Sequence, residues 1–146
     1  MELDRSIQLL LNGLHYKKLL ESKICSIQEK YGLRKVDIEV LYYLATCGTK
    51  DTARDIREEM NLTKGHISQA VDRMQKMCIL EQITDKDDRR YVHLQPTEHA
   101  RSLMEEIKIV WEELNQSVFA GITAEEHQVL KNVAIKIKNN LEKELK

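Results

Sequence analysis

Residues that interrupt helices are scarce in this sequence. Its 146 residues include one proline, Pro96, and only five glycines. Proline and glycine are the strongest local punctuation of a chain, because they favour turns and end helices. Their scarcity argues against a chain with many tight turns and predicts a mainly helical fold.

Long apolar runs and paired cysteines are also missing, and 32% of the residues are charged. No stretch approaches the roughly 18 apolar residues of a membrane helix, and Met1–Arg5 do not resemble the start of a secretory signal. Cys25, Cys47 and Cys78 are odd in number and contain no CxxC pair, which favours reduced thiols over a disulfide framework. We therefore expect a single cytoplasmic unit.

Motifs of catalysis and of metal binding are missing too. The sequence contains no nucleophile elbow and no phosphate-binding glycine loop. Its five histidines are scattered, without the HxxxH or HExxH spacing that would place two of them on one helical turn. We expect no enzymatic activity, no cofactor and no metal site.

Apolar periodicity predicts helices toward both ends of the chain. Apolar side chains recur at spacings of three and four from Leu3 to Ile27, which predicts one long helix ending near Gly32. A second helix is expected over residues 35–46. Beyond the centre of the chain, a long helix is expected from about Pro96.

The last part of the sequence carries clear stop and start signals. Gly121 should end the long helix near Ala120. Thr123 and Glu126 have the spacing of a capping box, which predicts the start of a final helix.

The most specific pattern in the chain begins at residue 51. Asp51 or Thr52 can cap a short helix that ends near Met60, and Thr63 can cap a second helix that runs to about Met77. Two short helices joined by a tight turn are the arrangement of a helix-turn-helix, whose second helix can enter the major groove of DNA.

A β-hairpin is expected directly after these helices. Residues 79–84 and 91–95 alternate apolar and polar side chains, and Ile83, Val92 and Leu94 fit a half-buried hairpin. Its tip reads DKDDRR at residues 85–90. A ribbon that ends in arginines can reach the DNA backbone or the adjacent minor groove.

Overall charge gives this interpretation little help. The formal net charge is -1, whereas DNA-binding domains are often strongly basic. Residues 51–95 contain eight Lys or Arg against nine Asp or Glu, but residues 63–76 contain three against one. Affinity for DNA would therefore have to come from where the cations are placed.

The order of these elements is similar to that of the MarR family of winged helix-turn-helix transcriptional regulators. The matching motifs are LTKGHISQAVDRM at residues 62–74, DKDDRR at residues 85–90 and YVHLQPT at residues 91–97. The resemblance implies one MarR-like unit over residues 1–146. It comprises a winged DNA-binding lobe over about 34–97 and helical dimerisation regions over about 1–31 and 98–146.

The expected DNA-contacting residues lie on the second short helix and at the hairpin tip. They are Thr63, Lys64, Gly65, His66, Ser68, Gln69, Arg73, Lys76, Lys86, Arg89 and Arg90. Thr63 and the free amides of its turn can bind a phosphate. Gln69 and Arg73, four residues apart, share a face and have side chains suited to adenine and guanine. Gly65 either permits close approach of the DNA backbone or is a tolerated surface glycine.

The resemblance also implies how the wing works. Arg90 would enter the minor groove, whose negative potential attracts arginine when the groove is narrow. Asp88 would orient Arg90 by a charged hydrogen bond and would not touch DNA. The family further implies a homodimer on a pseudo-palindromic operator, with half-sites about one helical turn apart.

A small-molecule effector and a redox alternative complete the expectations. The resemblance implies an effector pocket, for which the candidates are His15, Tyr16, Tyr42, Tyr43, Met104 and Trp111, and a repressor released when the effector binds. A regulator of the same fold that senses oxidants through a cysteine is the first alternative, although buried structural cysteines are the commoner outcome. A helical dimer that binds protein in place of DNA is the second.

Overall fold

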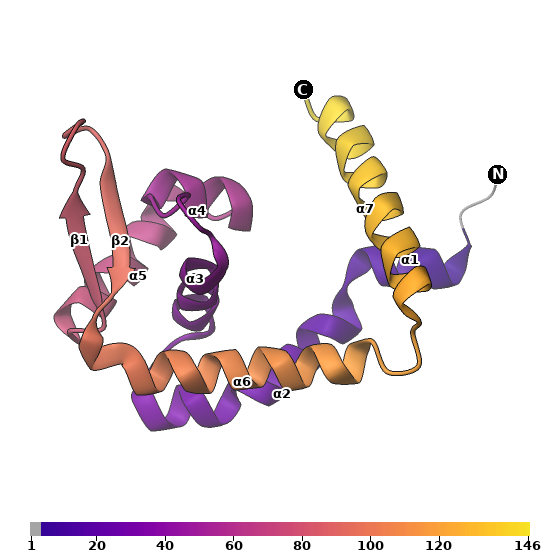
Figure 1. The fold of residues 1–146 in the computed structure, drawn as a ribbon, viewed down its shortest axis with the longest axis horizontal. Coiled ribbons are helices and arrows are strands. Elements are labelled where there is room, and N and C mark those ends of the chain that lie inside the picture. The colour runs from indigo at the N-terminus through magenta and orange to yellow at the C-terminus, as the bar shows by residue number, and fades with distance from the viewer. Residues whose placement is uncertain (1–3) are drawn as a thin grey trace. The chain divides into compact units, whose positions relative to one another are not determined.

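The computed structural model describes residues 4–146, so Leu3, the first residue of the predicted N-terminal stripe, lies outside the described part. The described residues form mainly helices and one antiparallel hairpin (Figure 1), which confirms the predicted fold class. The elements are α1 (Arg5–Asn12), α2 (Leu14–Tyr31), α3 (Lys35–Thr46), α4 (Ala53–Met60), α5 (Lys64–Lys76), β1 (Leu80–Thr84), β2 (Val92–Pro96), the 3-10 turn η1 (Glu98–Ala100), α6 (Arg101–Val118) and α7 (Ala124–Glu144). Within the described part, no helix has the length and apolar character needed to cross a membrane.

The N-terminal region contains two helices, so the prediction of one long helix is wrong. Gly13 adopts a left-handed conformation, with φ 68° and ψ 12°, and separates α1 from α2. Its amide donates to the carbonyls of Leu9 and Leu10, which closes the last turn of α1. Glycine adopts this conformation without the steric penalty of a Cβ. The apolar spacing continues across the break, and periodicity alone therefore does not reveal it.

The helix-turn-helix forms because both of its helices carry local caps. The Thr52 hydroxyl accepts a hydrogen bond from the Asp55 amide, and the Asp55 carboxylate accepts one from the Thr52 amide. Asn61 ends α4 in a left-handed conformation, with φ 52°. The Thr63 hydroxyl then accepts from the His66 amide at 3.2 Å and begins α5. These contacts satisfy backbone groups that helix ends leave free.

The hairpin pairs Leu80 with Pro96 at its base and Thr84 with Val92 near its tip. Leu80 and Leu94 are buried, but Ile83 is 40% exposed, so the expectation that Ile83 helps to form a half-buried face is wrong. The Leu94 amide also donates to the Asp51 carbonyl at 3.0 Å. That bond joins the second strand to the loop before α4 and ties the wing to the helix-turn-helix.

The chain divides into two compact units, residues 1–114 and 115–146. The first contains the apolar core, built from α2 to α6, with Ile24, Ile38, Ile56 and Ile107 fully buried. In the second unit, α7 contains no buried residue. The division into a DNA-binding lobe and dimerisation regions stays a prediction.

One buried carboxylate connects α3 to α5. Asp37 is 1% exposed, and one of its oxygens accepts from the Arg34 amide at 2.9 Å. The other accepts from the Arg73 guanidinium at 2.7 Å. Because a buried charge is tolerated only when it is paired and hydrogen-bonded, this contact fixes how α5 lies against α3.

We expect Asp37→Ala to lower the free energy of unfolding by about 3 kcal/mol, because it leaves the Arg73 guanidinium without its carboxylate. Asp72→Ala is the matched control. Asp72 forms an exposed ion pair with Lys76 at 3.0 Å, and both residues lie on α5. Such exposed pairs contribute about 0.5 kcal/mol or less. Urea unfolding followed by circular dichroism measures both. Equal losses in the two variants would contradict the assigned role of Asp37.

Candidate nucleic-acid interface

Helix α5 buries one face and exposes the other. Ile67, Ala70, Val71 and Met74 point into the core. The opposite face is solvent-exposed and carries Thr63, Lys64, Gly65, His66, Ser68, Gln69 and Lys76. At its start, backbone amides of the first turn and the positive end of the helix dipole face outward, which suits an anion.

Arg73 does not belong to this exposed face in the way that the sequence suggested. Its guanidinium lies on the buried Asp37 carboxylate, and its side chain is only 27% exposed. Breaking that pair to reach a base would leave Asp37 buried and uncompensated, which is costly. The contact favours a positioning role for Arg73 on α5, and the expectation that it reads guanine together with Gln69 stays a prediction.

Nothing in the fold itself requires glycine at position 65. Its backbone does not adopt a left-handed conformation, and an added Cβ would meet only the Thr63 hydroxyl oxygen, at 4.0 Å. Glycine costs helix stability relative to alanine. The two expectations for this glycine, close approach of the DNA backbone and a tolerated surface residue, therefore both stay predictions.

The wing tip is built by its own acids. One oxygen of Asp85 accepts from the amides of Asp87 and Asp88, at 2.8 and 3.0 Å. The Asp88 carboxylate then accepts from the Arg90 side chain, at 3.0 Å from Nε and 2.7 Å from Nη2. The charged hydrogen bond expected between Asp88 and Arg90 is thus present. It lowers the pKa of Asp88 and raises that of Arg90.

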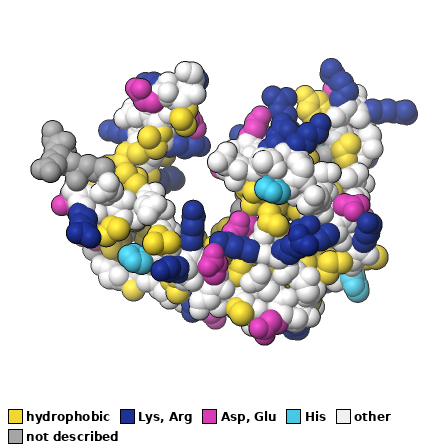
Figure 2. Space-filling model, turned by 180° about the vertical axis from the view of Figure 1, so that it is seen from behind, with side chains coloured by type: hydrophobic (Ala, Val, Ile, Leu, Met, Phe, Trp, Pro, Cys, Tyr) yellow, Lys and Arg dark blue, Asp and Glu magenta, His cyan; other side chains and the backbone are white. Residues whose placement is uncertain are grey.

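Arg90 is held in place and still accessible. Its side chain is 86% exposed, whereas that of Asp88 is 31% exposed. Lys86 and Arg89 are exposed beside it. Space-filling shows Lys and Arg side chains gathered on the lobe at the right of the view, with acids among them (Figure 2).

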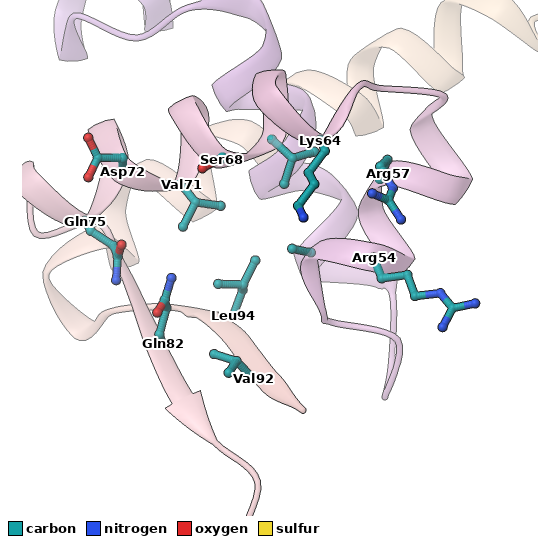
Figure 3. A pocket seen from close by; sticks show the side chains of 12 residues that line it. Arg54, Arg57, Lys64, Ser68, Val71, Asp72, Gln75, Gln82, Val92 and Leu94 are labelled. Atoms are coloured by element: carbon teal, nitrogen blue, oxygen red, sulfur yellow. The ribbon is translucent and has the colours of Figure 1, made fainter. Parts of the chain in front are cut away.

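A groove of about 580 Å³ lies between α5, α4 and the hairpin. Apolar side chains, among them Val92 and Leu94, line part of it. Its charged lining residues are Lys64, Arg57 and Arg54 and one acid, Asp72. Lys64 points toward the groove, whereas Arg54 extends away from it (Figure 3). Sequence reasoning missed both arginines, although a spacing of three on a helix that buries Ile56 places them on its outer surface.

The six candidates for an effector pocket do not all meet. Tyr42 stacks on Trp111, with ring centroids 4.2 Å apart and planes 15° apart. Tyr42 and Met104 line a groove of about 430 Å³. The Tyr43 hydroxyl is turned elsewhere and donates to the Lys50 carbonyl at 2.8 Å.

The remaining two candidates lie on α2. His15 is exposed. Tyr16 is 42% exposed and lies near Tyr42 and Glu39. Partial burial and these two neighbours raise the pKa of Tyr16.

The cysteines are free thiols, and none of the three is buried. The expectation of buried structural cysteines is therefore wrong: Cys25 and Cys78 are exposed and Cys47 is half-buried. Burial, followed by the charge of Asp51, raises the pKa of Cys47, which opposes formation of the reactive thiolate. Among residues 4–146, no cluster of three or more His, Cys, Asp or Glu side chains is arranged to hold a metal ion.

Comparison with known proteins identifies the same arrangement elsewhere. Residues 33–100 match the family model of the winged helix DNA-binding domain. The structure of transcriptional regulator PA3341 matches with a TM-score of 0.82 at 20% identity, over 94% of this chain and 98% of that chain. A MepR–DNA complex from S. aureus matches with a TM-score of 0.73 at 17% identity, over 94% of this chain and 96% of that chain.

The transcription regulator MarR from Oenococcus oeni PSU-1 is similar as well. It matches with a TM-score of 0.71 at 17% identity, over 93% of this chain and 99% of that chain. No curated protein sequence matches the chain.

The exposed second helix, the hairpin beside it and the family match together define the class of fold: residues 33–100 have the fold of a winged helix domain. More particularly, the whole chain has the fold of the MarR-type regulators, as the sequence resemblance predicted.

Proposed function

We propose that this protein is a transcriptional repressor that binds a pseudo-palindromic operator as a homodimer and is released by a small molecule. One observation carries the DNA-binding part. The polar face of α5 and the braced Arg90 are exposed on the same lobe, and the groove between α5, α4 and the hairpin is lined by three cations and one acid. A helix for the major groove and an arginine for the minor groove suit duplex DNA.

Each group has a distinct task in this proposal. The first turn of α5, Lys64, Arg54 and Arg57 contact phosphates, which fix orientation without reading sequence. His66, Ser68 and Gln69 lie toward the base edges, and Gln69 can form two hydrogen bonds with adenine. The operator half-sites lie about one helical turn, roughly 10 base pairs, apart.

Exposed apolar faces support the homodimer. On α1, Leu10 and Leu11 are 65% and 53% exposed, and on α7, Val129 and Leu141 are 61% and 56% exposed. Large apolar side chains left exposed along a helix commonly mark an interface where they form a patch. A second copy offers the same faces, and most homo-oligomers pair such faces through twofold symmetry.

The groove lined by Tyr42 and Met104 is the proposed effector site. It offers an aromatic surface and charged groups, among them Glu98, Arg101 and Lys108. An apolar body with a few polar partners is typical of small-molecule sites. The spacing of the two recognition helices must match the half-sites of the operator. An effector that binds better to a dimer with another spacing would increase the population of that state and lower the affinity for DNA.

The class of target is tested by selecting bound fragments from a random pool of duplex DNA. The expected product is an A·T-rich inverted repeat, retained at low salt and released at high salt because phosphate contacts displace counterions. A pool that stays unenriched, with binding that ignores salt, would contradict the DNA-binding proposal and favour a protein partner.

Arg90→Ala should weaken operator binding by about 10- to 100-fold, the range for losing one groove arginine. Arg101→Ala is the matched control, because Arg101 is similarly exposed and pairs with Glu98 at 3.1 Å, outside the wing. Both variants should keep the unfolding midpoint of the parent chain. Mobility-shift titrations measure affinity, and unchanged affinity in Arg90→Ala would rule out the wing assignment.

Gly65→Ala should separate the two explanations of this glycine. Alanine meets no close contact within the chain, so the free energy of unfolding should stay the same or rise by about 0.5 kcal/mol. Operator affinity should fall if the DNA backbone approaches position 65. A variant with full affinity would mean that Gly65 is only a tolerated surface residue.

Val133→Glu on α7 should convert the dimer to a monomer, because it places a charge in the apolar face proposed to pair. Lys136→Glu changes charge on the same helix and is the control. Light scattering coupled to size-exclusion chromatography reports the mass directly. A parent chain with the mass of one copy at micromolar concentration would overturn the homodimer.

A further inference from the structure

A histidine in the second strand of the wing lies between two carboxylates. The Nδ1 atom of His93 is 2.5 Å from an Asp51 oxygen, and its Nε2 atom is 2.7 Å from an Asp85 oxygen. Asp51 belongs to the loop before α4, and Asp85 begins the wing tip. We call Asp51, His93 and Asp85 the wing clamp.

The geometry of the wing clamp requires a charged imidazole. A neutral imidazole has one donor nitrogen and one acceptor nitrogen, whereas an imidazolium has two donors. Both ring nitrogens of His93 face carboxylate oxygens, which only accept when ionised. Loss of the proton would leave a nitrogen lone pair against one carboxylate, and that contact would break.

The wing clamp is connected to the arginine proposed to enter DNA. The Asp85 oxygen not used by His93 accepts from the amides of Asp87 and Asp88. Asp88 in turn holds the Arg90 guanidinium. Hydrogen bonds therefore run from the loop before the helix-turn-helix, through His93, to the exposed arginine.

No cation inside the described chain replaces the proton of His93. Among residues 4–146, Asp51 and Asp85 form ion pairs with His93 alone. The other neighbouring elements add no charge that faces the ring. On β1, the residue paired with His93 is Ile83, and on α4 the nearby Asp55 is bonded to Thr52.

We propose that protonation of His93 holds the wing in its DNA-binding position, so that the protein binds DNA more weakly as the solution becomes alkaline. The inference rests on the proposed function for its DNA readout, and on the wing clamp alone for its structural readout. His93 acts as a positioning residue for Arg90. Its deprotonation also removes a positive charge near the DNA, a change that opposes binding.

The direction of the pH dependence follows from the two partners. Contact with Asp51, then with Asp85, raises the pKa of His93. Its contribution is therefore complete below the ordinary histidine pKa of about 6.5 and is lost as pH rises through the raised value. Contact with His93, then the amides of Asp88 and Asp87, lowers the pKa of Asp85 to about 2. That contribution is complete above about 3.9 and is lost only as pH falls toward about 2.

The test measures operator affinity at about pH 6 and about pH 9, at constant ionic strength because salt alone changes DNA affinity. The parent chain should lose about tenfold in affinity, the change produced by a one-unit shift in the pKa of one group. His99→Gln is the control and should lose the same amount, because His99 is exposed and its side chain forms no hydrogen bond or ion pair within residues 4–146. His93→Gln should bind the operator more weakly than the parent chain at about pH 6. Its affinity should be the same at the two pH values. Asp51→Asn keeps the histidine but removes one carboxylate, so its pH midpoint should move to lower pH.

A second measurement needs no DNA. Nuclear magnetic resonance of the full chain follows the His93 ring signals and the exchange of the Asp87 and Asp88 amides with solvent. Protection of these amides should fall over the same pH range in which His93 loses its proton. In Asp51→Asn, both changes should occur at lower pH. This readout also covers the case in which His93→Gln fails to fold.

The outcomes separate the two proposals. If the parent chain binds DNA and its pH dependence persists in His93→Gln, or the Asp51→Asn midpoint does not move, the inference is overturned. If the chain binds no DNA at either pH, the proposed function fails. The wing clamp is then judged by the amide exchange, and protection that ignores the His93 titration overturns it.

Discussion

The ion pair between Asp37 and Arg73 is the contact on which the arrangement of the winged helix region depends. It joins α3 to α5 through a carboxylate that is almost completely buried, and a buried charge keeps its partner because separation is costly. With Arg73 held inward beside the apolar face of α5, the remaining polar side chains of that helix are directed outward. The same pair that stabilises the core therefore decides which face the helix offers to a ligand.

The wing depends on a second set of charged contacts, made by acids that at first oppose a DNA-binding role. Asp85 holds the backbone of the wing tip and Asp88 holds Arg90, so two carboxylates are used to position one cation. The Arg90 side chain is 86% exposed, so its guanidinium stays accessible to a ligand although Asp88 holds it. A chain with a net charge of -1 can thus present local positive charge, because potential near a surface depends on placement more than on the sum.

Sequence reasoning predicted the parts of this fold that have local causes. The caps at Thr52, Thr63 and Thr123 lie within three residues of the groups they bond, so their spacing is visible in the sequence. The alternation of the hairpin is local in the same sense. The hydrogen bond that Arg90 donates to Asp88 spans only two residues as well, but it was expected from the family resemblance. The break at Gly13 was missed because a glycine inside a continuous apolar stripe is also compatible with an unbroken helix.

By itself, then, the sequence determined the order of the elements, the helix-turn-helix and the charged wing, because caps, turns and periodicity act over a few residues. Only the tertiary structure decided what the side chains within those elements do. Arg73 and Asp37 are 36 residues apart, and His93 and Asp51 are 42 apart. Which carboxylate a cation meets at such separations depends on how the helices and the hairpin pack. That packing joined Arg73, expected from the sequence to read a base, to the buried Asp37 carboxylate, and it placed a strand histidine at the centre of the wing clamp.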